Sequence, residues 1–192
     1  MGLVFERLAT SLNPTLRKGP GKPVQAKVAG ISGLDGSTGY ASKVIECPYL
    51  YYPWRRKKDI RWIKLPTVET YLRSAEAEFT SFALVDSGAI ASFLQKEEAD
   101  LLGLKPKKGA DGKEVTVEAE GAGGEFKCYE TVVQELTLRK DGVPFQSYRG
   151  RQVLVPEKAE TLPYSILGRD TIFKQFDITF RENNKLIVFK RR

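Results

Sequence analysis

The sequence predicts a mainly β protein, a small closed barrel of many short strands with one or two short helices. From residue 63 onward, short apolar or alternating runs follow one another, and turn residues separate them. Few segments have apolar residues at helical spacing. Hydrophobic residues make up 41% of the 192 residues, which is enough to bury a core.

The first elements of this domain are predicted before and just after Asp86. The run from Val68 to Leu72 is extended, and Phe79 to Val85 ends in an apolar stretch typical of a buried strand. The segment from Ser92 to Leu102 has apolar residues at helical spacing. Because Gly103 follows it directly, we expect a helix that ends there.

The second half of the chain predicts further strands joined by tight turns. Strands at 115–117 and 129–138 flank a glycine-rich tip, Gly121-Ala122-Gly123-Gly124, and Asp141-Gly142 marks a hairpin turn. The remaining elements are short strands at 153–155 and 165–167, a short helix at 171–175 capped by Asp170, and a closing hairpin of 176–180 and 186–189.

Residues 1–62 differ in composition, and we expect a basic, Gly/Pro-punctuated N-terminal extension followed by a domain of residues 63–192. Residues 1–66 hold 12 Lys and Arg against 4 Asp and Glu, whereas the remaining residues hold 19 against 20. Glycine and proline interrupt residues 1–48 without a sustained period, which indicates loop or weakly ordered chain.

A basic aromatic segment, residues 49–64, allows two interpretations. It begins Tyr49-Leu50-Tyr51-Tyr52-Pro53-Trp54 and continues Arg55-Arg56-Lys57-Lys58. Aromatic rings beside basic side chains stack on bases and bind phosphates in nucleic-acid-binding proteins. The alternative is a solvated basic linker whose aromatic residues pack on the next domain.

The absence of histidine narrows the chemistry. The chain has no His and two Cys, so it can build no Ser-His-Asp triad, Cys-His pair, His-ligated zinc site or four-thiolate zinc site. A hydrolase made from this sequence uses carboxylates, lysine or an oxygen-liganded metal. We expect Cys47 and Cys128 to be buried free thiols, with a disulfide as the alternative. No membrane-spanning run and no secretory signal are evident, so we expect a cytoplasmic protein without membrane contact.

The segment Leu84-Val85-Asp86-Ser87-Gly88-Ala89 carries the chemistry. A carboxylate directly follows a buried apolar strand, which fixes the position of Asp86. The hydroxyl of Ser87 can hold the loop, and Gly88 lets another backbone approach closely. Taken alone, the motif also fits an ordinary turn after a strand.

Two further segments add to this motif. The glycine tip suits a mobile hairpin, and Ser165-Ile166-Leu167-Gly168-Arg169-Asp170 places two apolar residues and a glycine before a helix start. In this order, the three segments resemble the retropepsin-like aspartic proteases, the family of retroviral proteases and their cellular relatives. The resemblance covers about residues 63–192 and leaves residues 1–62 without a counterpart.

The resemblance implies an aspartic endopeptidase with an acid-protease β-barrel that acts as a homodimer on peptide or protein substrates, without a metal or other cofactor. Each chain would supply one Asp86, and the two carboxylates would share a proton and hold a water. It also assigns residues to an active-site loop (Ser87, Gly88, Ala89), a flap (Gly121, Ala122, Gly123, Gly124) and a support (Ile166, Leu167, Gly168, Arg169).

One departure from the family concerns the partner of Arg169. Retroviral members have an acidic residue shortly after the catalytic triplet that can pair with this arginine, but here Ile90 and Ala91 follow Ala89. Glu97 and Glu98 are the candidate partners. Ile90 fits either an apolar substrate subsite or the core.

Two other functions stay open at this point. One is a catalytically silent retropepsin-like module that binds peptides or dimerises. The other is a nucleic-acid-associated protein that uses residues 49–64.

Overall fold

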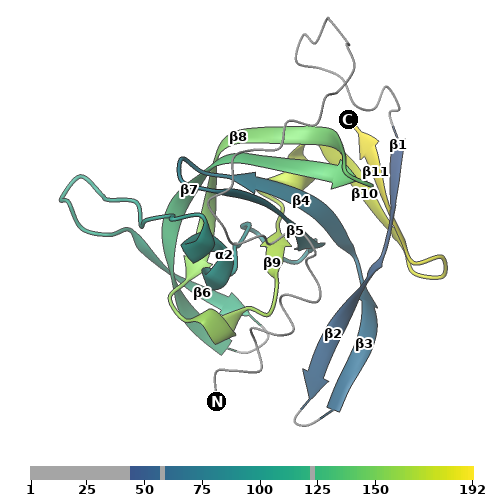
Figure 1. The fold of residues 1–192 in the computed structure, drawn as a ribbon, viewed down its shortest axis with the longest axis horizontal. Helices are drawn as coiled ribbons and strands as arrows, with labels where there is room; N and C mark the ends of the chain where they lie inside the picture. The colour runs from purple at the N-terminus through teal and green to yellow at the C-terminus, as the bar shows by residue number, and fades with distance from the viewer. Residues whose placement is uncertain (1–43, 57–58, 122–123) are drawn as a thin grey trace, which may run out of the picture. The chain divides into compact units, whose positions relative to one another are not determined.

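The computed structural model describes residues 44–56, 59–121 and 124–192, and these residues are mainly β (Figure 1). A single α-helix, α2 (Lys96–Leu101), and two short 3-10 helices, η1 (Ala159–Thr161) and η2 (Ile172–Lys174), are found among them. The described strands pair into three sheets, so the class predicted from the sequence is confirmed. Closure into a barrel stays a prediction.

The largest sheet positions the candidate site. Its strand order is β6-β7-β4-β5-β9, and β8, which lies off this path, also pairs with β7. All its pairs are antiparallel except β5 with β9, which run parallel. The strands are β4 (Thr67–Arg73), β5 (Glu78–Val85), β6 (Thr116–Gly121), β7 (Gly124–Lys140), β8 (Val143–Pro156) and β9 (Ser165–Leu167).

Two smaller sheets complete the described part of the chain. The first has the order β1-β11-β10 and joins β1 (Val44–Pro48) to the C-terminal hairpin of β10 (Phe176–Arg181) and β11 (Leu186–Arg191). The second is a hairpin of β2 (Leu50–Arg56) and β3 (Asp59–Leu65). Figure 1 shows β1 running directly into this hairpin.

One hydrophobic core unites residues of the large sheet and the β1-β11-β10 sheet. Phe145 of β8, Phe176 of β10 and Phe189 of β11 form an aromatic cluster, with ring centroids 5.5–6.2 Å apart. Such aromatic pairs stabilise a fold beyond the area that they bury. The C-terminal hairpin is therefore packed firmly against the strand that follows the Asp141-Gly142 turn.

The domain boundary differs from the predicted one. The position between residues 62 and 63 falls inside β3, and β1 is paired with β11 along its whole length. Ile45, Cys47 and Tyr49 are buried in the core. The folded body thus begins no later than Val44. Residues 1–43 of the predicted extension, which spans 1–62, lie outside the described residues.

The helix predicted over residues 92–102 is shorter than expected. Phe93 exchanges backbone hydrogen bonds with Ile166, and Leu94 donates its N–H to Leu154. These bonds hold residues 92–94 extended between β8 and β9, so the helix begins only at Lys96. Pairing with two distant strands overrides the local helical pattern.

Both cysteines are buried free thiols, as expected. Burial raises the pKa of Cys47 and of Cys128 to about 11, so both stay protonated at neutral pH. In the part of the chain that the structure describes, no helix is long and apolar enough to cross a membrane.

Candidate active site

Asp86 stands where β5 leaves the sheet. The preceding residue, Val85, is buried and pairs with the buried Leu167 of β9. The backbone N–H of Asp86 donates to the carbonyl oxygen of Leu167 over 3.1 Å. Strand β9 therefore holds the backbone at Asp86 in place, while the Asp86 side chain is only partly buried.

The loop after Asp86 folds back on the carboxylate. The N–H of Gly88 donates to Oδ1 of Asp86 over 2.8 Å, and a Cβ at Gly88 would lie 3.2 Å from the same oxygen. This N–H orients one carboxylate oxygen and leaves the other without a loop partner in the described structure. Ser87 is exposed in the single chain.

Gly168 packs beneath this loop. A Cβ at this position would lie 2.6 Å from the carbonyl carbon of Ala91 and 2.9 Å from the carbonyl oxygen of Ala89. These are backbone atoms that cannot move aside easily, so only glycine fits. The next residue, Arg169, donates its backbone N–H to the oxygen of Ala89 over 2.9 Å.

A polar network below the loop was missed in the sequence. Ser92 accepts the N–H of Gly168 at 3.0 Å and donates to Oδ1 of Asp170 at 2.8 Å. Arg151 of β8 reaches Asp170 from the other side, with Nη2 lying 2.6 Å from Oδ2 and 2.9 Å from the backbone oxygen. The network ties the support segment to β8 through a charge-assisted pair.

The expected pairing of Arg169 with Glu97 or Glu98 is not found among the described residues. Arg169 is exposed, and the ion pairs among the described residues do not include it. Its proposed partner Glu98 accepts hydrogen bonds from the hydroxyls of Ser81 and Ser165 instead. The neighbouring Arg151–Asp170 pair is the ion pair that braces the loop.

Glu98 is a second buried polar centre close to the site. Its side chain joins α2 to Ser81 of β5 and Ser165 of β9, the two parallel strands that support Asp86. Burial raises the pKa of the Glu98 carboxyl, and the two serine hydroxyls oppose this shift. The helix is thereby locked to the strands that carry the catalytic loop.

The predicted flap is a β-hairpin. Gly121 of β6 pairs with Gly124 of β7, and Gly124 has a φ of 103°, which favours glycine. Phe126, two residues further along β7, lies with its ring centroid 6.1 Å from that of Phe93, which is bridged to Ile166. The hairpin is thus connected to the support segment, while Ala122 and Gly123 lie outside the described residues.

Tyr164 is a further neighbour of Asp86 that no sequence pattern indicated. Burial raises the pKa of its phenol, and the negative charge of Asp86 adds to the shift. Tyr52 of β2 meets the Tyr164 ring edge-on, with centroids 5.2 Å apart, and its hydroxyl donates to the carbonyl oxygen of Pro163. The β2–β3 hairpin therefore fixes the loop before β9.

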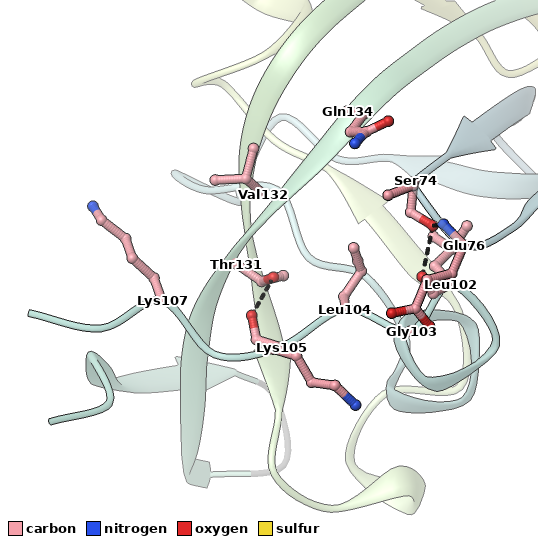
Figure 2. A pocket seen from close by; sticks show the side chains of 11 residues that line it. Ser74, Glu76, Leu102, Gly103, Leu104, Lys105, Lys107, Thr131, Val132 and Gln134 are labelled. Atoms are coloured by element: carbon pink, nitrogen blue, oxygen red, sulfur yellow. Dashed lines mark hydrogen bonds between the residues drawn. The ribbon is translucent and has the colours of Figure 1, made fainter. Parts of the chain in front are cut away.

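A cleft of about 330 Å³ lies elsewhere, beside the turn between β4 and β5 (Figure 2). This turn precedes β5, whereas Asp86 follows it, so the eight-residue strand separates them by about 25 Å. Ser74 donates to the oxygen of Leu102 at 2.6 Å, and Thr131 donates to that of Lys105 at 2.7 Å. Both hydroxyls that line the cleft are therefore bonded to backbone oxygens of the fold. The cleft is separate from the carboxylate site.

The described residues show no group of three His, Cys, Asp or Glu side chains able to hold a metal ion. The chemistry that this site offers is that of a partly exposed, backbone-oriented carboxylate. Such a group acts as a general base or acid when a substrate or a water lies against it.

Comparison with known proteins agrees with this geometry. Residues 80–171 match the aspartyl protease family, a range that holds Asp86, the flap hairpin and the support segment. Residues 80–171 thus form an aspartyl protease domain, which confirms the class of protease predicted from the sequence. No curated protein sequence matches the chain.

Two solved structures are similar to the chain. The EIAV protease, in complex with an inhibitor, is 23% identical with a TM-score of 0.40, over 58% of this chain and 88% of that one. A retropepsin-like aspartic protease from Rickettsia conorii is 15% identical with a TM-score of 0.42, over 76% of this chain and 90% of that one.

Proposed function

We propose that the protein is an aspartic endopeptidase in which two Asp86 carboxylates, one from each chain of a homodimer, activate a water that hydrolyses a peptide bond. The observation that supports this most is the setting of Asp86. Its backbone is held by β9, one carboxylate oxygen is oriented by the Gly88 amide, and the side chain stays partly exposed.

In this mechanism one Asp86 carboxylate acts as a general base and the other, protonated, acts as a general acid. Two carboxyl groups in close contact repel each other when both are ionised, so the pair holds one proton between them. The ionised carboxylate takes a proton from water, whose oxygen attacks the peptide carbonyl carbon. The protonated carboxyl donates to the carbonyl oxygen. The carboxyl that took the proton from water then gives it to the amide nitrogen, and the other carboxylate removes a proton from a hydroxyl of the tetrahedral diol. The C–N bond breaks, the product carboxylic acid and amine leave, and the pair again holds one proton.

The surroundings of Asp86 suit an extended peptide substrate. Phe126 of the β6–β7 hairpin lies near Phe93, which is bridged to Ile166 of the support segment, and the hairpin would close over a bound peptide. Ile90, next to the active-site loop, is 78% exposed, which favours an apolar subsite over a place in the core of the single chain. Its exposure also fits a surface that a second chain covers.

Asp86→Asn tests the proposal. Asparagine keeps the shape of the side chain but cannot accept a proton from water, so we expect cleavage of casein or a peptide library at acidic pH to fall by about a thousandfold. Asp111→Asn, at an exposed loop carboxylate, is the matched control and should keep full activity. A pepstatin-type inhibitor should abolish cleavage by the unaltered protein.

Circular dichroism should show that both variants stay folded. Undiminished cleavage by Asp86→Asn would reject the mechanism. Absence of cleavage by the unaltered protein, with retained peptide binding, would instead favour a catalytically silent peptide-binding module.

A further inference from the structure

The β2–β3 hairpin carries an aromatic face, which we define as Tyr51, Trp62 and Lys64. Tyr51 pairs with Lys64 across the hairpin, and Trp62 lies two residues from Lys64 on β3. Residues opposite one another, and residues two apart on a strand, project from the same side of a sheet. Tyr51 is 64% exposed and Trp62 is 53% exposed, so two large aromatic rings are exposed to solvent on the same side of the hairpin.

A cation stands against one of these rings. The Nζ atom of Lys64 lies 4.9 Å from the centroid of the Tyr51 ring, within the range of a cation–π contact. This contact orders both side chains on the surface. It also places a positive charge directly beside an exposed stacking surface.

The opposite face of the hairpin attaches it to the protein body. Tyr52, which alternates with Tyr51, packs edge-on against Tyr164 and donates its hydroxyl hydrogen to the Pro163 carbonyl oxygen. A lone two-stranded hairpin is marginally stable in water, so this attachment matters. The aromatic face is held in place by residues of the other face and is free for a ligand.

The charge of the segment selects the kind of ligand. Residues 49–64 contain six Lys and Arg against one acidic residue, Asp59. Four of the basic residues, Arg55-Arg56-Lys57-Lys58, follow one another in the sequence. A second copy of the chain would bring like charge against like charge, which disfavours self-association through this face. The ligand is therefore a polyanion.

We propose that the aromatic face binds single-stranded nucleic acid, with bases stacked on Tyr51 and Trp62 and phosphates near Lys64. An acidic protein or an anionic membrane would satisfy the charge but does not repeat a planar group beside every negative charge. Single strands supply both, because every base has a face that stacks on an aromatic side chain. This inference is independent of the peptidase proposal.

Fluorescence anisotropy of the full chain with a labelled oligodeoxythymidine and with the same length of oligouridine tests the proposal. We expect the Tyr51→Ala/Trp62→Ala double variant to bind either strand at least about tenfold more weakly. Phe82→Ala, which removes an exposed ring from β5, is the matched control and should change affinity less than about twofold. Lys64→Gln should reduce the slope of log affinity against log salt by about 0.7.

An abasic oligonucleotide of equal length separates stacking from charge. It keeps the phosphates but lacks the bases, so we expect it to bind the unaltered protein about tenfold more weakly and to bind the double variant equally weakly. The proposal would be overturned if the unaltered protein bound the abasic and the base-containing oligonucleotides with equal affinity. It would also be overturned if the Tyr51→Ala/Trp62→Ala double variant bound the base-containing oligonucleotide as tightly as the unaltered protein. Binding only to phosphatidylserine vesicles or to polyglutamate would overturn it as well and would assign the face to those partners.

Discussion

Glu98 places a carboxyl group inside the protein, where the hydroxyls of Ser81 and Ser165 donate to it. Burial raises its pKa above the ordinary value of 4.5, although both hydrogen bonds stabilise the ionised form. A carboxyl with a raised pKa binds its proton more tightly in the folded state. Its contribution to stability is therefore full below the unfolded pKa and is lost as the pH rises through the folded one.

We expect Glu98→Gln to change how stability depends on pH. Glutamine keeps the shape and can still bond both serines, but it does not ionise. Relative to the unaltered protein, the variant should gain stability from about pH 4.5 upward, by on the order of 1 kcal/mol for each unit of pKa shift. Urea unfolding at several pH values measures this. Glu97→Gln, at the exposed neighbour, is the control, and parallel pH curves for Glu98→Gln and the unaltered protein would contradict the argument.

At this same scale, the sequence predicted the residues whose roles are local. Asp86 follows a buried strand, and Gly168 follows two apolar residues, so both stand out as short motifs. The Ser92, Asp170 and Arg151 network does not, because Ser92 and Asp170 are 78 residues apart and no spacing links them. Neither Glu97 nor Glu98, the partners expected for Arg169, forms an ion pair with it among the described residues. Glu98 is instead bonded by Ser81 and Ser165, which lie 17 and 67 residues away in the sequence.

At the scale of elements, the residues of the turns made the hairpins predictable. Strands that depend on a partner far along the sequence were not predictable. Asp141-Gly142 joins β7 to β8, with both residues at positive φ, and the glycine tip joins β6 to β7. By contrast, β1 has only five residues and is stabilised by β11, some 140 positions later. Its alternating burial follows from that partner, so the sequence alone predicts a domain boundary that falls inside β3.

The β6–β7 hairpin gives a prediction at this scale. Gly124 has a φ of 103° and open space around its Cα, so Gly124→Ala strains the backbone by about 1 kcal/mol or more without a clash. Gly112→Ala is the matched control, because Gly112 has a φ of 76° and equally open space but lies in a loop before β6. We expect similar losses in melting temperature from both variants. Only Gly124→Ala should raise KM or lower kcat for peptide cleavage, and equal kinetics in the two variants would show that the hairpin is not a flap.

At the scale of the whole molecule, the sequence contains Asp-Ser-Gly once, at Asp86, whereas the proposed chemistry needs two carboxylates. A second chain must supply the other. The surface around the loop is suited to being covered, because Ser87 is exposed and Ile90 exposes most of its apolar side chain. Burial of such a surface on association would stabilise a dimer.

The dimer is tested by titrating active protein with the Asp86→Asn variant at a fixed concentration of active chains. Mixed dimers hold one carboxylate, so random pairing with an equal amount of variant leaves only half of the active chains in active dimers, and activity should fall to about half. An independent monomer would keep its full activity under the same addition. Dilution of the unaltered protein gives a second measure, because specific activity should decrease as dimers separate, with light scattering reporting the mass at each concentration. Activity unchanged by the variant, together with a demonstrated monomer at the active concentration, would mean that a single chain holds the complete catalytic site.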